Sequence, residues 1–460
     1  MASSLCFNQS QAGSLCHFLI RKKIIAHLHQ RLGLQGVNSE IRYQWSGLRQ
    51  ATKQMKRNFK RIAKILLGLL AALVLVGAFV SWRSHAKVEA ALSAIRDTGA
   101  PVSLADLEPD LVPVEDNAAT YLTPVIADAN KLAIELYPIA NADDFTWRNG
   151  LSESQIQQCA KALDAYPQVA SAIERASQCK HLNWELDYRV APSQFSGKII
   201  ESIQNLRSFA RVQVCRAHWL AATEVPDAAA ILLLQELRLI RLHDETPTLM
   251  AALVNTAMRR EMCDQLNGLL QTSDVAPETH QAIEKELAEH DSSDRVTQML
   301  KTERAFGIES FREFPWFVGT NDQLVYYLDF MTKQIGLSSK LPFERPAVTT
   351  VEVSGMTELI ASSLNTCLGA MDNTRTKLRC LRILNAIHAQ GKKVAGVSIA
   401  NIGLPNESTI DPYSGKPLIV KSTDAGWQVY SVGPNGKDDG GQSLHDATTE
   451  ASKDIGVGPH

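Results

Sequence analysis

One uncharged run of 18 residues, Ile65 to Trp82 (ILLGLLAALVLVGAFVSW), limits what this chain can fold into. A helix of that length rises about 27 Å, which is close to the thickness of the hydrocarbon core of a bilayer. The run has no polar face, whereas a surface helix of a globular protein normally keeps one. It therefore predicts a single transmembrane helix over residues 65–82.

Basic residues before this run predict the orientation of the chain. They are Lys53, Lys56, Arg57, Lys60, Arg61 and Lys64. Positively charged flanks stay on the cytoplasmic side. We therefore expect a single-pass protein of the bacterial inner membrane, with a cytoplasmic arm over residues 1–64 and an extracytoplasmic C-terminal domain. A cleaved signal peptide is the competing interpretation, because Ser84-His85-Ala86 fits a small-x-small cleavage site. The length of the run and the charge of Arg83 favour a retained anchor.

Charge is divided unevenly along the chain. Residues 1–64 contain 12 Lys and Arg against one acidic residue, whereas the remainder contains 35 against 48. No nucleic-acid-binding fold accompanies the basic arm, so we expect no nucleic-acid partner. Residues 1–54 lack sustained periodicity, while MKRNFKR from Met55 is typical of the start of an anchored protein. Either the start codon is mis-assigned, or residues 1–54 form a tail that binds anionic lipid.

Hydrophobic spacing indicates helices through most of residues 83–400. The clearest signal lies in residues 206–270, where apolar stripes alternate with short breaks at 224–227 and 243–247. Antiparallel helices with short turns result, which predicts a mainly α, extracytoplasmic helical-hairpin domain with tetratricopeptide-like packing. Another hairpin is expected from helices Gly355–Met371 and Thr374–Ala389, with a turn at Asp372-Asn373.

The eight cysteines form no CxxC motif, which excludes zinc ribbons and thioredoxin-type motifs. Cys367 and Cys380 would lie at similar heights on the two helices of that last hairpin. The oxidising compartment outside the membrane would permit a disulfide between them. Two buried free thiols are the alternative.

After residue 400 the sequence pattern changes from that of helices to that of turns and strands. DPYSGKPL, from Asp411, reads as a turn, and residues 418–421 and 427–432 alternate as strands. The sequence therefore predicts a small β-hairpin tail over residues 401–443 and disorder over residues 444–460. Asp411, Asp438 and Asp439 are candidate calcium ligands, although their spacing is not that of an EF-hand. Aspartates that form turns beside glycines are the other interpretation.

Two resemblances add expectations. The tail, with DPYSGKPL and WQVYSVGPNGKDDGG, resembles the C-terminal part of the major pseudopilins of type II secretion, over about a tenth of the chain. This resemblance also implies calcium near the hairpin. The pseudopilin N-terminal methylation signature is absent from the sequence. The segments PVSLADL, PVEDNAA, LRSFARV and DAAAILLLQELRLIRLHDE are similar to a group of membrane-anchored bacterial helical proteins, and that similarity implies no particular activity.

Catalytic motifs are absent from the sequence: HExxH, the P-loop, GxGxxG after a strand and GxSxG. His218 lies beside Arg211 and Cys215 on a helix face, but a lone helical histidine is usually structural. We therefore expect no catalytic or cofactor-binding residues, and a membrane-anchored module that binds or scaffolds a protein partner in the envelope. A secretion or pilus-associated component and an enzyme with a site built from distant helices remain open as alternatives.

Overall fold

The computed structural model describes residues 38–142, 145–246, 248–292, 294–313, 320–346, 356–391, 399, 402–441 and 453–459. Contacts divide the chain into two units, Met1–Arg83 and Ser84–His460. The described residues are mainly helical and include one small antiparallel sheet. The predicted class, a mainly α chain with an apolar N-terminal helix, is confirmed at this level.

The described part of the first unit is helical. It belongs to helix α2 (Asn38–Arg96), which continues into the second unit. The helix is long and apolar enough to cross a membrane, and no side chain in its most apolar window is buried. The predicted segment 65–82 lies inside α2. Residues 1–37 lie outside the described residues, so most of the predicted arm has no structural description.

The second unit begins with the last turns of α2. Val88, Leu92 and Ile95 are buried there among side chains of later helices. Helix α2 ends at Arg96, and Gly99 just after it has a φ of +71°. The next elements are η1 (Ala105–Leu107), η2 (Val114–Asp116), α3 (Ala118–Leu122), η3 (Thr123–Val125), α4 (Ile126–Ala140), α5 (Glu153–Ala165) and α6 (Pro167–Ala176).

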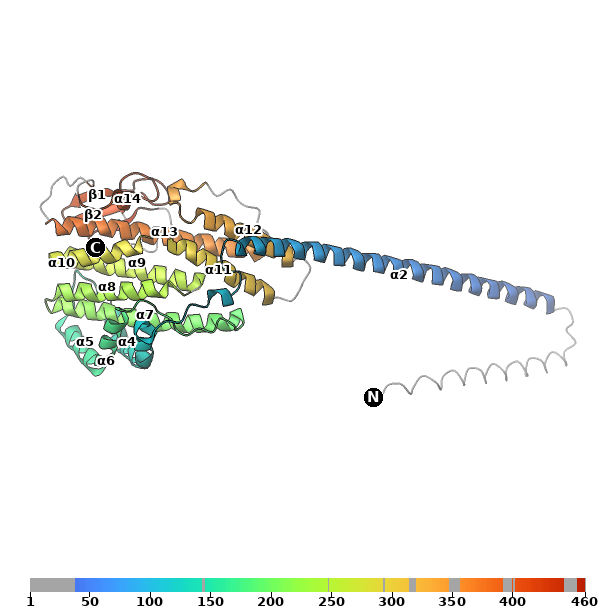
Figure 1. The fold of residues 1–460 in the computed structure, drawn as a ribbon, viewed down its shortest axis with the longest axis horizontal. Coiled ribbons are helices and arrows are strands. Elements are labelled where there is room, and N and C mark those ends of the chain that lie inside the picture. Colours follow the sequence, from blue (N-terminus) through green and yellow to red (C-terminus); the bar gives the residue numbers. More distant parts are fainter. Residues whose placement is uncertain are drawn as a thin grey trace. The chain divides into compact units, whose positions relative to one another are not determined.

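The main core lies between long helices that pack side by side (Figure 1). They are α7 (Pro192–Ala222), α8 (Pro226–His243), α9 (Leu249–Thr272), α10 (Pro277–His290) and α13 (Met356–Ala389). Proline begins α7, α8 and α10, where its missing N–H costs no helical hydrogen bond. The helices α11 (Asp294–Glu313) and α12 (Thr320–Leu337) share a second core with the end of α2, and η4 (Pro342–Glu344) follows.

Helix α13 corrects the hairpin predicted over residues 355–389. Asp372 and Asn373 lie within one continuous helix of 34 residues instead of forming a turn. Distant residues hold both side chains: Arg345 donates to Asp372, and the hydroxyl of Tyr413 donates to Asn373. These polar residues therefore serve tertiary contacts and do not interrupt the helix.

The continuity of α13 also excludes the predicted disulfide. Cys367 and Cys380 lie 13 residues apart on this helix, which separates them by about 20 Å along its axis. A disulfide needs Cα atoms within about 7 Å of each other. Both thiols are free and buried, so the predicted bridge is wrong and the free-thiol alternative holds.

The C-terminal sheet has three strands, β1 (Ile419–Thr423), β2 (Gly426–Ser431) and β3 (Ile455–Val457), after the short helix α14 (Asn406–Thr409). The predicted hairpin of β1 and β2 is confirmed. The expected disorder is wrong for residues 453–459, because β3 pairs with β2 and Val457 is fully buried. Leu418, Val429 and Val457 join the same core as the long helices, so the sheet is part of the helical domain's core.

Candidate functional site

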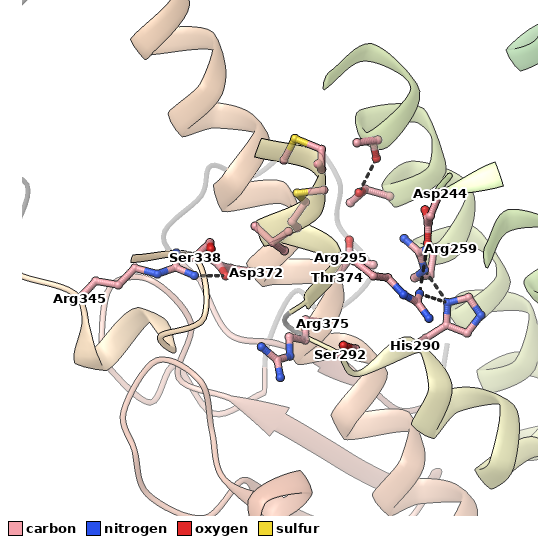
Figure 2. A pocket seen from close by; sticks show the side chains of 15 residues that line it. Asp244, Arg259, His290, Ser292, Arg295, Ser338, Arg345, Asp372, Thr374 and Arg375 are labelled. Atoms are coloured by element: carbon pink, nitrogen blue, oxygen red, sulfur yellow. Dashed lines mark hydrogen bonds and ion pairs between the residues drawn. The ribbon is translucent and has the colours of Figure 1, made fainter. Parts of the chain in front are cut away.

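A charged pocket lies where α9, the start of α11, the segment 338–345 and the middle of α13 meet (Figure 2). Four arginines line it, and each comes from a different one of these parts: Arg259, Arg295, Arg345 and Arg375. Two carboxylates, Asp244 and Asp372, also line it. We call it the arginine pocket.

Asp244, directly after α8, is held by three donors. Its Oδ2 accepts from Nη2 of Arg259 at 2.6 Å and from Nη1 of Arg295 at 3.2 Å, and its Oδ1 accepts from Nδ2 of Asn255 at 3.0 Å. Burial tends to raise the pKa of Asp244, but the two guanidiniums outweigh burial and hold that pKa below its usual range. Asp244 is therefore ionised near pH 7 and fixes both arginines in the pocket wall.

His290, at the end of α10, connects this group to Glu286. Its Nδ1 accepts from Nε of Arg259 at 2.7 Å, and its Nε2 lies 3.4 Å from Oε1 of Glu286. Since Nδ1 is an acceptor, we assign the proton to Nε2, on the side of Glu286. Burial lowers the pKa of His290 to about 4. The ring is thus neutral near pH 7 and adds no positive charge to the pocket.

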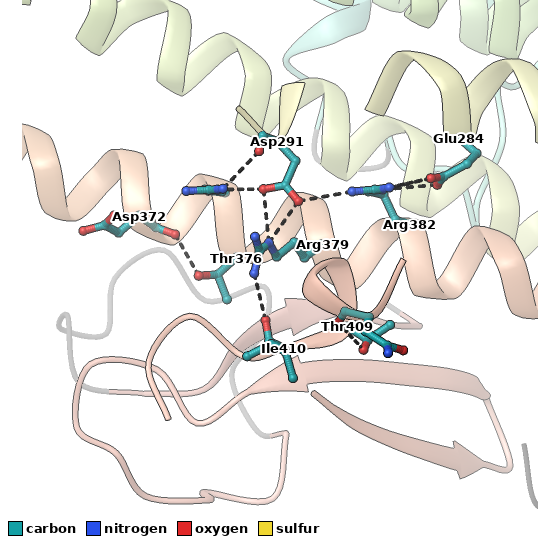
Figure 3. Close-up of polar contacts among 10 residues, drawn as sticks. Glu284, Asp291, Asp372, Thr376, Arg379, Arg382, Thr409 and Ile410 are labelled. Atoms are coloured by element: carbon teal, nitrogen blue, oxygen red, sulfur yellow. Dashed lines mark hydrogen bonds and ion pairs between the residues drawn. The ribbon is translucent and has the colours of Figure 1, made fainter. Parts of the chain in front are cut away.

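A second group of ion pairs continues along α13 (Figure 3). Arg375, Arg379 and Arg382 all donate to the carboxylate of Asp291, at distances of 2.6–3.1 Å. Their spacing of four and three residues places them on one face of the helix. Arg382 also donates to Glu284 at 2.6 Å. This group therefore joins α10 to α13 beside the arginine pocket.

The ion pairs in and around the pocket contain more cations than anions. Eight arginines take part: Arg238, Arg241, Arg259, Arg295, Arg345, Arg375, Arg379 and Arg382. Five carboxylates receive them: Asp244, Glu284, Glu286, Asp291 and Asp372. Each arginine contacts a carboxylate, but several share one, so eight minus five leaves a net excess of three positive charges in these contacts. Partly buried charge is costly when it is not balanced, so the arrangement favours an added anion.

The remaining polar lining suits the same ligand. Thr256, Ser292, Ser338 and Thr374 line the pocket together with the arginines. Guanidinium groups bind the planar edge of a carboxylate or phosphate. The hydroxyls of Thr256 and Ser338 already donate to the backbone carbonyls of Ala252 and Ile335, so the guanidiniums would be the main donors to a ligand. The pocket can therefore hold an oxyanion.

The predicted calcium ligands accept hydrogen bonds from the chain itself, Asp411 in one segment and the adjacent Asp438 and Asp439 in another. Asp411 accepts from the hydroxyls of Ser414 and Ser431, and Asp438 accepts from the hydroxyl of Tyr430 at 3.0 Å. Asp439 accepts from Asn435 at 2.9 Å. Within the described ranges, no group of three or more acidic, histidine or cysteine side chains is arranged to hold a metal ion. The three aspartates therefore do not form one ligand set here.

The side chain of His218 packs against aromatic rings. Its ring stacks between Phe145 and Trp147, with centroids 4.1 Å and 3.9 Å away. Its Nε2 lies 2.9 Å from Oε1 of Gln265, which also accepts from Nε1 of Trp147. Burial lowers the pKa of His218 to about 4. The ring is therefore a neutral packing element near pH 7.

Comparison with known proteins gives no further information on this site. No family model, no curated protein and no solved structure matches the chain.

Sequence reasoning missed the arginine pocket. Its arginines are separated by 30 or more residues along the chain, so no local motif joins them. One signal was present in the spacing of Arg375, Arg379 and Arg382. That regular spacing indicates a charged helix face, and a charged face is normally solvated unless acidic residues of another helix cover it.

Proposed function

We propose that this chain is a membrane-anchored binding protein whose helical domain takes an oxyanion, either a phosphate or a carboxylate group, in the arginine pocket. One observation supports this proposal above the others: eight arginines in and around the pocket share five carboxylates. The oxyanion can belong to a small molecule or to an acidic group on an envelope protein.

Burial strengthens this argument. The side chain of Arg259 is 10% exposed and that of Arg295 is 22% exposed. Burial lowers the pKa of Arg295 to about 10, although Asp244 acts in the opposite direction. The charged form of this guanidinium is therefore less well stabilised than it would be in water. An oxyanion in the pocket would stabilise that charged form.

The proposed cellular location is the bacterial inner membrane, with the C-terminal domain on the extracytoplasmic side. The basic residues between Lys53 and Lys64 support this orientation. An apolar helix of sufficient length supports anchoring. The two alternatives from the sequence, a secretion or pilus-associated component and an enzyme, have no separate support among the residues that the structure describes.

The proposal can be tested with the full chain in lipid nanodiscs. Its thermal midpoint would be measured against rising inorganic phosphate, acetate or chloride at constant ionic strength. A ligand that binds only the folded state raises stability by about 2.7 kcal/mol at a hundredfold excess over its dissociation constant. We expect a saturable rise with phosphate or acetate that chloride does not reproduce.

Two arginine variants distinguish binding in the arginine pocket from a general effect of the protein's positive charge. Arg345→Gln removes a pocket guanidinium and should reduce the rise. Arg189→Gln removes a guanidinium that is 76% exposed and pairs with Glu108 outside the pocket, and it should leave the rise unchanged. Equal responses to all three salts, or equal effects of both substitutions, would reject the proposal.

A further inference from the structure

The charge of the lining determines which oxyanion suits the arginine pocket. Four arginines and two aspartates line it. Four minus two leaves a formal charge of +2, and His290 adds nothing because its ring is neutral near pH 7. A dianion would balance this charge, whereas a carboxylate or a phosphate diester carries a single negative charge. Partly buried charge is costly when it is not balanced, so the lining favours a dianionic group such as a phosphate monoester.

Two of the guanidiniums keep N–H groups for a ligand. Arg259 uses Nε and Nη2 for His290 and Asp244. Arg375 uses Nε and Nη2 for the carboxylate and the backbone carbonyl of Asp291. Among the described residues, Nη1 of neither arginine has a hydrogen-bond partner, and neither Nη1 is one of the fully buried polar atoms. Since each Nη1 carries two N–H groups, these donors of the lining remain accessible to an anion.

Two hydroxyl groups of the lining add further donors (Figure 2). Oγ of Ser292 accepts from the backbone N–H of Asp294 at 3.2 Å, so its own O–H remains available. Thr374 is only 4% exposed, yet its Oγ1 has no hydrogen-bond partner in the described part of the chain and is not fully buried. A hydroxyl held in this way in a charged pocket can donate to an oxygen of the ligand.

The size of the pocket limits it to one phosphate group. Its cavity volume is about 60 Å³. One water molecule needs roughly 10–15 Å³ on this scale, so the pocket has room for about four to six groups of that size. A phosphate ester places four oxygens around one phosphorus and matches this room, whereas a diphosphate has seven oxygens and exceeds it.

One part of the lining is apolar. Ala252, Val296 and Met371 pack against the second core, to which Met299 belongs. We call these four residues the apolar wall. An inorganic phosphate would turn a charged oxygen toward this wall and lose the hydration of that oxygen. A phosphate ester presents a carbon substituent there instead, and this substituent can pack against apolar side chains.

Building on the oxyanion binding proposed above, we propose that the arginine pocket binds a phosphate monoester as its dianion. Arg259 and Arg375 donate to its terminal oxygens, and the ester carbon lies against the apolar wall. A soluble monoester and a lipid with a monoester headgroup share this chemistry.

Methyl phosphate and methyl sulfate test the charge, because they have the same shape and differ by one negative charge. Each would be titrated by calorimetry into the full chain in phosphatidylcholine nanodiscs at constant ionic strength. The pH would be about 7.5, above the second pKa of a phosphate monoester, which is about 6. We expect methyl phosphate to bind at least about tenfold more tightly than methyl sulfate, since one unit of charge matters strongly in a partly buried site. Methyl phosphate should also bind more tightly than inorganic phosphate and pyrophosphate.

Thr374→Val and Thr366→Val are matched variants on α13, because both replace a hydroxyl by a methyl group of similar size. Thr374→Val removes a donor of the pocket and should weaken the binding of methyl phosphate about tenfold. Thr366 is exposed outside the pocket, and its hydroxyl donates to the carbonyl of Ser362 at 3.0 Å. Thr366→Val should therefore leave the binding unchanged.

Equal affinities for methyl phosphate and methyl sulfate would overturn this proposal while leaving oxyanion binding intact. Tighter binding of inorganic phosphate or pyrophosphate, or equal effects of the two threonine variants, would overturn it in the same way. No binding by any of these anions would overturn both this proposal and the proposed function.

The lipid of the nanodiscs distinguishes the two sources of the monoester. Phosphatidic acid is a monoester, and phosphatidylglycerol is an anionic diester that serves as its control. Weaker binding of methyl phosphate in discs with phosphatidic acid than in discs with phosphatidylglycerol would identify a lipid headgroup as the ligand. Equal binding in the two kinds of disc would identify a soluble monoester, and either result supports the shared chemistry.

Discussion

Replacing Asp291 with asparagine would remove the carboxylate that three arginines of α13 share (Figure 3). Arg382 would keep Glu284, and Arg379 would keep the carbonyl of Ile410 at 3.0 Å. Arg375 would keep the backbone carbonyl of residue 291.

The size of this effect follows from burial. The side chain of Asp291 is 6% exposed, and those of Arg379 and Arg382 are 4% and 5% exposed. Removing one partner of a buried ion pair costs roughly 3–5 kcal/mol, because the remaining charge stays buried. All three arginines retain another acceptor, but only Arg382 retains a carboxylate, so we expect Asp291→Asn to lower the free energy of unfolding by about 3 kcal/mol, the lower end of that range.

Urea unfolding of the full chain in nanodiscs, followed by tryptophan fluorescence, measures this change. Asp329→Asn is the matched control, because Asp329 pairs with Lys333 on the surface and both side chains are more than half exposed. An exposed pair contributes about 1 kcal/mol or less. Adding Arg375→Gln to Asp291→Asn should restore part of the lost stability, since one unbalanced charge is removed. Equal small changes for Asp291→Asn and Asp329→Asn would refute this reasoning.

Three further predictions concern the core and the membrane segment. Burial, with a smaller contribution from a neighbouring carboxylate, raises the pKa of Glu236 to about 8, and neither of its carboxylate oxygens has a described partner. The unfolded pKa is near 4.3, so between pH 5 and 8 the unfolded state binds fewer protons at this position than the folded state, and the wild type loses stability as the pH rises. Glu236→Gln removes this loss. Relative to the wild type it should therefore become more stabilising by about 1.4 kcal/mol per pH unit over this range, which urea unfolding at several pH values can measure. Gly268→Ala should destabilise by about 1–3 kcal/mol, because its Cβ would overlap the indole of Trp147. Gly197→Ala, in open space on α7, should stabilise by up to about 1 kcal/mol, and a finding of equal effects would exclude the steric cause. A reporter fused after His460 should be active outside the cytoplasm, and activity confined to the cytoplasm would reject the proposed orientation.

Local signals predicted much of the fold correctly. The stripe that contains Leu233 and Leu237 predicted α8, and both side chains are fully buried. The start of α3 is decided just as locally, since the side chain of Asn117 accepts from the backbone N–H of Ala119. In both cases the deciding interactions lie within a few residues of each other, so a single sequence is sufficient to predict them.

Elements fixed by distant contacts were predicted poorly. Asp372-Asn373 is typical of a turn when read alone, yet Arg345 and Tyr413 hold these residues within a continuous helix. Strand β3 has only three residues and is ordered by pairing with β2, for example between Val429 and Val457. The arginine pocket has the same origin, because its charged residues meet only after five helices have packed.

Calorimetric titration of inorganic phosphate into the full chain in nanodiscs, at constant ionic strength, tests the central claim most directly. The account predicts one saturable site per chain. Arg295→Gln should weaken the affinity about tenfold, which corresponds to about 1.4 kcal/mol, and Arg189→Gln should leave it unchanged. No saturable heat with phosphate, or unchanged affinity in Arg295→Gln, would contradict the claim that the arginine pocket binds an oxyanion.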